Sequence, residues 1–86
     1  MTDFKEIPME IKAKALRAAL RDMIPAKSVP VVKSFGLTPD EEKYIIAVDI
    51  RRKSIAQTAM ENHASEETVK RSRERGFARM ILELNT

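Results

Sequence analysis

The fold prediction starts from residues 54–81, which read SIAQTAMENHASEETVKRSRERGFARMI. Two helix-start signals occur in this stretch. Ser54 followed by Gln57 has the form of a capping box, and Ser65 precedes two glutamates that suit the positive end of a helix dipole. The stretch therefore predicts a short helix to about Asn62, a brief turn and a longer helix. These are the parts of a helix-turn-helix.

The spacing of small and apolar residues agrees with that prediction. Two crossing helices need a small residue at the contact, which Ala59 supplies, and an apolar residue that packs back, which Val69 supplies. The turn needs a residue that accepts a positive φ, and Asn62 or His63 does so more readily than most residues. We expect the longer helix to bury one apolar face, made of Val69, Phe77, Met80, Ile81 and Leu84.

Another helix is predicted just before this stretch. Thr38 supplies a capping hydroxyl, Pro39 suits the first helical position and Glu41 completes a capping box. The helix is expected to end near Arg51. Its apolar positions are Ile45, Ile46, Val48 and Ile50.

The N-terminal part predicts a long helix from about Pro8 to Met23, with Pro25 ending the pattern. Its apolar residues recur at helical spacing and are Met9, Ala13, Leu16, Leu20 and Met23, broadened by Ile11, Ala15 and Ala19. This stripe is expected to face the core, although two heptads also fit a coiled-coil seam with a second copy.

The following segment, residues 28–36, fits either a short strand or a short helix that Ser28 caps and Gly36 ends in a left-handed conformation. The helix is favoured because no second strand is evident for pairing. The predicted fold is therefore all-α. A three-helix helix-turn-helix unit at residues 37–86 follows an N-terminal helical extension at residues 1–36, which packs on that unit or mediates dimerisation.

Composition excludes several classes of function. The chain has 86 residues, enough for one small domain, and it contains no cysteine and one histidine, His63. A thiolate site, a zinc cluster and a histidine-based catalytic relay are therefore not expected, nor is a glycine-rich phosphate loop from two isolated glycines. We expect a protein that is not an enzyme, with no cofactor, metal or small-molecule substrate. No apolar run is long enough for a bilayer, so no membrane contact and a cytoplasmic location are expected.

Three pieces of the sequence, LTPDEEKYII, KSIAQTA and SEETVKRSRERG, resemble region 4 of bacterial sigma factors and the related output domains of response regulators. The resemblance spans about residues 37–84. In that family a Ser-x-x-Thr-Val-Lys run opens the DNA-recognition helix, and Ser65, Thr68, Val69 and Lys70 match it here. The resemblance implies a small sequence-specific protein that binds double-stranded DNA, such as a bacterial or phage transcription regulator.

The sequence also departs from the family pattern. Thr58 and Asn62 stand where the family has apolar residues, His63 replaces the turn glycine and Ser72 replaces a second apolar anchor. These departures concern the packing of the two helices.

Under this interpretation the helix after Ser65 reads the major groove. Lys70 and Arg71 are placed to donate to guanine O6 and N7, and Glu66 or Glu67 to accept from cytosine N4. Hydroxyls at the start of the helix and the stripe of Arg71, Arg75 and Arg79 suit phosphates, as does the run of Arg51, Arg52 and Lys53. The candidate DNA-binding residues are Ser65, Glu66, Glu67, Thr68, Lys70, Arg71, Glu74, Arg75, Arg52 and Lys53.

Two alternatives stay open. The pairs Glu66–Lys70 and Glu67–Arg71 also have the spacing of ordinary ion pairs on a solvated helix face. The chain could instead be a helical protein-interaction module, of an adaptor or antitoxin-like kind, with a contact surface of Met9, Leu16, Leu20 and Met23. A homodimer or a larger transcription complex is the expected assembly of a DNA reader this small. The target sequence, the sign of regulation and a phage packaging role are not distinguished.

Overall fold

The computed structural model describes residues 8–84, and this part of the chain contains helices and no strand. In order they are α1 (Met9–Asp22), α2 (Pro25–Lys33), α3 (Pro39–Ile45), the π-helix η2 (Ile46–Ile50), α4 (Ile55–Glu61) and α5 (Glu66–Leu84). The all-α prediction is thus confirmed. The predicted units 1–36 and 37–86 include residues 1–7 and 85–86, which lie outside the described residues.

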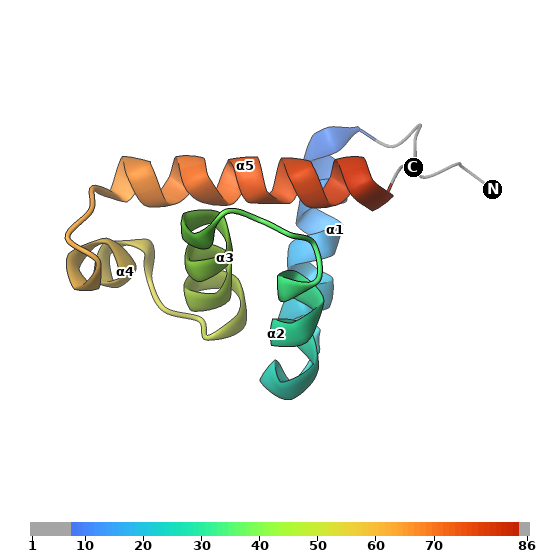
Figure 1. The fold of residues 1–86 in the computed structure, drawn as a ribbon, viewed down its shortest axis with the longest axis horizontal. Helices are drawn as coiled ribbons and strands as arrows, with labels where there is room; N and C mark the ends of the chain where they lie inside the picture. The colour runs from blue at the N-terminus through green and yellow to red at the C-terminus, as the bar shows by residue number, and fades with distance from the viewer. Residues whose placement is uncertain (1–7, 85–86) are drawn as a thin grey trace.

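Helix α5 is the element on which the others assemble. Figure 1 shows it running along one edge of the molecule, with α4, α3 and α1 crossing it in turn from its first residues to its last. A second, smaller cluster carries α4, and the main hydrophobic core joins α1, α2, α3, η2 and α5. Its buried members are Leu20, Val32, Leu37, Ile45, Ile50, Phe77 and Met80. The N-terminal extension therefore shares one core with α3, η2 and α5.

The start of α3 has the predicted capping box. The Thr38 hydroxyl accepts a hydrogen bond from the Glu41 amide at 3.3 Å, and the Thr38 amide donates to the Glu41 carboxylate at 3.1 Å. The helical segment ends at Ile50, next to the predicted end near Arg51, but its last turn, η2, is a π-helix rather than an α-helix. That widened turn was not predicted from the sequence.

The segment after α1 is a helix, as favoured, but its start differs from the prediction. Pro25 occupies the first turn of α2, so the helix begins three residues before Ser28. Ser28 does not cap it: the side chain is buried and donates to the Ile24 carbonyl at 3.3 Å. Proline suits this position because the amides of a first helical turn have no acceptor within the helix, so a residue without an amide hydrogen loses no hydrogen bond there. Gly36 has a φ of +65° and provides the predicted left-handed stop.

The apolar face of α1 is only partly buried. Leu20 is 1% exposed and Leu16 packs against the same cluster, which confirms a core-facing stripe. The N-terminal end of the stripe was predicted wrongly, since Met9 and Ile11 are 50% and 57% exposed while Lys12 is buried. Because α1 crosses α5 instead of lying along it, only part of its length meets the core (Figure 1).

This arrangement also bears on the alternative interaction surface. That surface required Leu16 and Leu20 to be accessible to a partner, and Leu20 is instead an inner residue of the core. Leu20 is therefore not accessible to a partner in this structure, whereas Met9, at the start of the stripe, is 50% exposed.

Helix α5 buries Val69, Phe77, Met80 and Ile81 as predicted, whereas Leu84 is 49% exposed and was predicted wrongly. Leu84 is the last residue of the helix, beyond the elements that cross it. Within residues 8–84 no helix combines the length and the apolar character needed to cross a membrane.

Candidate nucleic-acid interface

The predicted short helix, turn and long helix are present as α4, residues 62–65 and α5. Ser54 caps α4, because its hydroxyl accepts from the Gln57 amide at 2.9 Å. The turn contains His63 with a φ of +53°, the left-handed conformation expected for this residue or its neighbour. The Ala64 amide then donates to the Ala59 carbonyl at 2.9 Å and closes the end of α4.

The crossing of α4 and α5 involves the two residues predicted for it. Ala59 and Val69 are 4% and 0% exposed and lie in one cluster with Tyr44. Val48 and Ile55 pack against the same cluster from the flanks. A small residue on α4 thus faces a buried β-branched residue on α5, with α3 beneath them.

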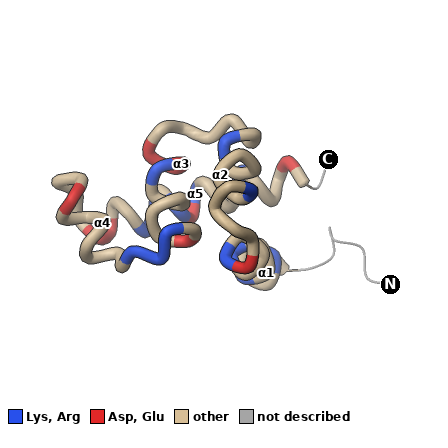
Figure 2. The backbone as a smooth tube through the Cα atoms, turned by 90° about the horizontal axis from the view of Figure 1, so that it is seen from below, with Lys and Arg blue, Asp and Glu red and all other residues tan. Residues whose placement is uncertain are grey.

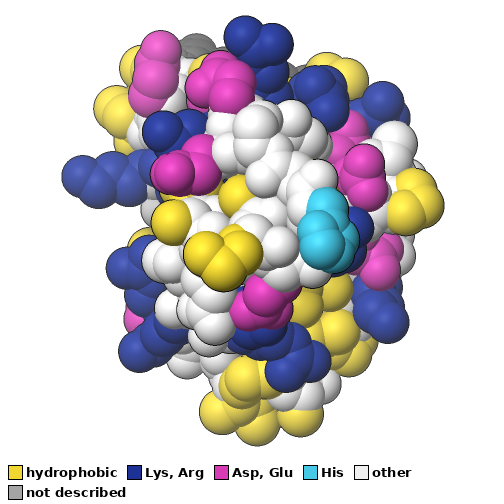
Figure 3. Space-filling model, turned by 90° about the vertical axis from the view of Figure 1, so that its left-hand side faces the viewer, with side chains coloured by type: hydrophobic (Ala, Val, Ile, Leu, Met, Phe, Trp, Pro, Cys, Tyr) yellow, Lys and Arg dark blue, Asp and Glu magenta, His cyan; other side chains and the backbone are white. Residues whose placement is uncertain are grey.

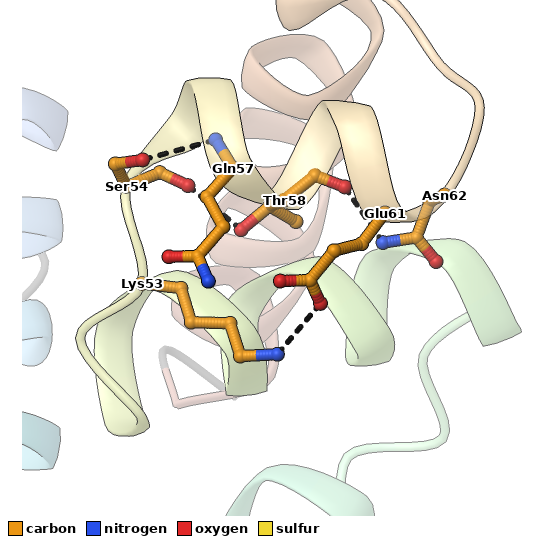
Figure 4. A network of polar contacts seen from close by, with 6 residues as sticks. All are labelled: Lys53, Ser54, Gln57, Thr58, Glu61 and Asn62. Atoms are coloured by element: carbon orange, nitrogen blue, oxygen red, sulfur yellow. Dashed lines mark hydrogen bonds and ion pairs between the residues drawn. The ribbon is translucent and has the colours of Figure 1, made fainter.

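Polar residues at expected apolar positions of α4 are satisfied by the main chain. The buried Thr58 hydroxyl donates to the Ser54 carbonyl at 2.9 Å, and the Asn62 side-chain amide donates to the Thr58 carbonyl at 2.8 Å (Figure 4). Ser72 on α5 is also buried, and the Arg75 guanidinium donates to its hydroxyl at 3.3 Å. These departures from the family pattern are therefore compatible with close packing of the two helices.

Ser65 caps the start of α5. Its hydroxyl accepts from the Thr68 amide at 3.0 Å and lies 2.8 Å from the Thr68 hydroxyl. Both side chains are exposed at the positive end of the helix. The two hydroxyls that were assigned to phosphate contacts are hydrogen-bonded to each other in this structure.

The arginines predicted to form a basic stripe have carboxylate partners. The Arg71 Nε donates to Glu67 at 2.9 Å, which matches the ordinary ion pair foreseen as an alternative. Nε of Arg79 and Nε of Arg75 lie 3.3 and 3.8 Å from the same oxygen of Glu41, whose side chain is 2% exposed. The guanidinium groups stay largely exposed, but their charge is partly neutralised within the chain.

The remaining candidates on α5, Glu66, Lys70 and Glu74, are exposed as well. Lys70 and Glu74 line the hollow where α1 meets α5. The eight candidates in α5 and at its cap, Ser65, comprise three cations, three carboxylates and two hydroxyls. Figure 3 shows the α4 end of the molecule, with His63 in cyan and with cationic and anionic side chains intermixed. The predicted reading surface therefore has little net charge.

Arg52 and Lys53 are separated from these eight residues. They lie in the loop between η2 and α4, on the side of the molecule opposite to α5 (Figure 1). Arg52 has a φ of +59° and donates to the Arg21 carbonyl at 3.4 Å. Lys53 donates to Glu61 at 2.8 Å, and this hydrogen bond lowers the pKa of Glu61 below its ordinary value of 4.5 (Figure 4).

An ion pair missed in the sequence holds α5 against η2. Arg73 donates to both carboxylate oxygens of Asp49, from Nε at 2.9 Å and from Nη2 at 2.7 Å, and the two side chains are 14% and 2% exposed. Two signals could have found it. Asp49 interrupts an otherwise apolar run, and Arg73 lies midway between Val69 and Phe77 on the buried side of α5.

The described residues contain no group of three His, Asp or Glu side chains arranged to hold a metal ion. Comparison of the chain with protein-family models, curated protein sequences and solved structures found no match.

Proposed function

We propose that this protein binds double-stranded DNA in a sequence-specific manner, with α4, the turn and α5 acting as a helix-turn-helix. The observation that carries the proposal is the α4–α5 crossing at Ala59 and Val69. The crossing fixes the buried side of α5 and leaves the first turns of the helix exposed on its other side. A reading helix needs such a fixed, accessible face in order to enter the major groove.

Lys70 and Arg71 are the residues to which we assign base contacts. Lys70 has an exposed ammonium, and Arg71 is held by a single exposed pair with Glu67. Such a pair contributes only about 0.3–0.5 kcal/mol, so a guanine edge can replace the carboxylate at small cost. Glu67 would then be free to accept from a cytosine amino group. Ser65 and Thr68 are assigned to phosphates at the start of the helix.

The low net charge of this face and the small size of the unit limit the affinity of a single copy. A module of this kind buries only roughly 600–1,000 Å² on DNA. We therefore expect the protein to act as a homodimer or within a larger transcription complex of bacterial or phage type.

The test is fluorescence anisotropy with labelled duplex DNA selected from a random pool by the wild-type chain. The double variant Lys70→Ala/Arg71→Ala should lose the preference for the selected duplex over a scrambled one, because each base contact contributes about 1–3 kcal/mol of discrimination. Circular dichroism confirms that the variant remains helical.

Lys14→Ala is the control for loss of positive charge, since it removes an exposed lysine from α1, outside the proposed reading helix. The control should retain the preference for the selected duplex. A folded Lys70→Ala/Arg71→Ala variant with unchanged preference would contradict the assignment of α5 as the reading helix.

A further inference from the structure

A concentration of positive charge lies away from α5. Two shallow hollows of about 410 Å³ each flank the loop between η2 and α4, and both are lined by Lys53. As far as the described residues go, their cations come from α1, α2, α3 and the loop. We call these six residues the basic surface: Arg21, Lys33, Lys43, Arg51, Arg52 and Lys53. Figure 2, seen from below, shows the blue loop segment of this surface facing the viewer beside the end of α1.

The net positive charge of this surface exceeds the net charge of the whole chain. Among the described residues lining the two hollows, the only carboxylates beside the six cations are Glu42 and Glu61. The cations thus exceed the carboxylates by four, whereas the whole chain has a formal net charge of +3. The rest of the chain, including the neutral candidate face of α5, carries no excess of positive charge.

Several of these cations lack a compensating carboxylate. Lys53 pairs with Glu61, and Lys43 lies 3.6 Å from Asp40 and 4.9 Å from the centre of the Tyr44 ring. By contrast, Lys33 and Arg51 have no side-chain hydrogen bond or ion pair within residues 8–84.

Arg21 and Arg52 do not compensate each other either. The Arg52 guanidinium donates to the main-chain carbonyl of Arg21, which brings two positively charged residues together without a carboxylate at the contact. The guanidinium has five donors and this contact uses one of them. The others remain available to an anion.

The clustering has a tertiary cause. Cations near the end of a helix are favoured by its dipole. Arg21 precedes Asp22, the last residue of α1, while Lys33 is the last residue of α2 and Arg51 follows the last residue of η2. Each position is ordinary by itself. The fold brings these ends to one surface around the two hollows, where the cations lie closer to one another than the sequence alone indicates.

We infer that the basic surface binds the phosphate backbone of duplex DNA independently of α5. The inference rests on the proposed function for the identity of the partner, but not for the location of the contact. Exposed lysines and arginines around shallow hollows suit the phosphates of a nucleic-acid backbone, because their charge attracts phosphates whatever the base sequence. The surface supplies affinity without sequence preference, which the neutral face of α5 does not.

The test uses Lys33→Gln, Arg51→Gln and the double variant in the full chain, with Lys14→Gln as the matched control. Both test residues are exposed and, within residues 8–84, their side chains make no hydrogen bond or ion pair. Binding to two unrelated duplexes is measured by anisotropy between 50 and 300 mM salt. Each lost phosphate contact should flatten the slope of log affinity against log salt by about 0.9, so the double variant should lose about 1.8 on both duplexes. Lys14→Gln should leave the slope unchanged.

The variants separate the two proposals. Suppose that Lys33→Gln/Arg51→Gln retains the wild-type salt slope while Lys70→Ala/Arg71→Ala loses sequence preference. The proposed phosphate binding by the basic surface is then overturned, and the assignment of α5 as the reading helix stands. If the slope flattens while the α5 variant keeps its preference, the basic surface stands and the assignment of α5 fails. If Lys14→Gln flattens the slope of log affinity against log salt as much as each test variant does, the inference is overturned. The loss of any exposed cation would then reduce the salt dependence, wherever that cation lies. Absence of binding by the wild type at 50 mM overturns both.

Discussion

At the scale of single residues, Gly76 marks the closest approach of α5 to α3. A Cβ atom at this position would lie 2.5 Å from Cδ1 of Ile45 and 3.3 Å from Cβ of Glu41. We expect Gly76→Ala to lower the free energy of unfolding by about 1–2 kcal/mol, because overpacking outweighs the gain of about 1 kcal/mol in helix propensity. Urea unfolding followed by circular dichroism measures the change.

Gly36 provides the control for this prediction. It has a φ of +65° and nothing within 4 Å of a built Cβ, so its requirement is conformational and not steric. Gly36→Asn should therefore be nearly neutral, since asparagine accepts the left-handed conformation. An increase in stability for Gly76→Ala would show that α5 and α3 are less closely packed than described.

At the scale of secondary-structure elements, the pair of Asp49 and Arg73 fixes α5 against η2. Removal of one partner from a buried pair costs about 3–5 kcal/mol, and the lower end applies because Arg73 retains some exposure. Asp49→Asn should therefore lower the free energy of unfolding by about 3 kcal/mol. Chemical denaturation of wild type and variant, monitored through helix content, gives the difference.

Asp49→Asn/Arg73→Met is the informative companion variant. It replaces the ion pair by groups without a buried charge, so it should recover part of the loss. A cost below about 0.5 kcal/mol for Asp49→Asn would mean that the pair behaves like an exposed one.

At the scale of the whole molecule, the shared core predicts a single cooperative unfolding transition. Leu20 belongs to α1, yet it is buried together with Ile45 of α3 and Phe77 of α5. We expect Leu20→Ala to cost about 2–5 kcal/mol, a large part of the roughly 4–13 kcal/mol available to a domain of this length. Thermal unfolding followed at 222 nm should still show one transition, at a lower temperature.

The comparison for this prediction is Ile11→Ala, also on α1 but at a side chain that is 57% exposed. It should change the stability by less than about 0.5 kcal/mol. Two separate transitions in either variant would indicate that α1 and α2 unfold independently of the remaining helices.

The sequence predicted the elements of this fold better than the faces they bury. Helix starts follow from contacts three residues apart, so Thr38, Ser54 and Ser65 are found where their hydroxyls cap helices. The left-handed turn at His63 follows from equally local sterics. Met9 and Leu84 were placed wrongly in the core because periodicity does not show where a crossing helix begins or ceases to meet its neighbours.

The candidate site, like the fold, was predicted only where its features depend on residues close together in the chain. The position and exposure of Ser65, Lys70 and Arg71 follow from the register of α5 with respect to Val69. The carboxylate partner of Arg75 and Arg79 comes from Glu41, more than thirty residues earlier, and no local pattern reveals it.

The amino-acid sequence by itself determined an all-α chain, the boundaries of most helices and the turn between α4 and α5, because capping, helical periodicity and turn sterics act over a few residues. Only the tertiary structure decided that the first helices share the core, that Asp49 holds Arg73, and that six cations meet on a surface facing away from α5. Those arrangements depend on how the helices cross, and crossing is set by packing between residues far apart in the chain.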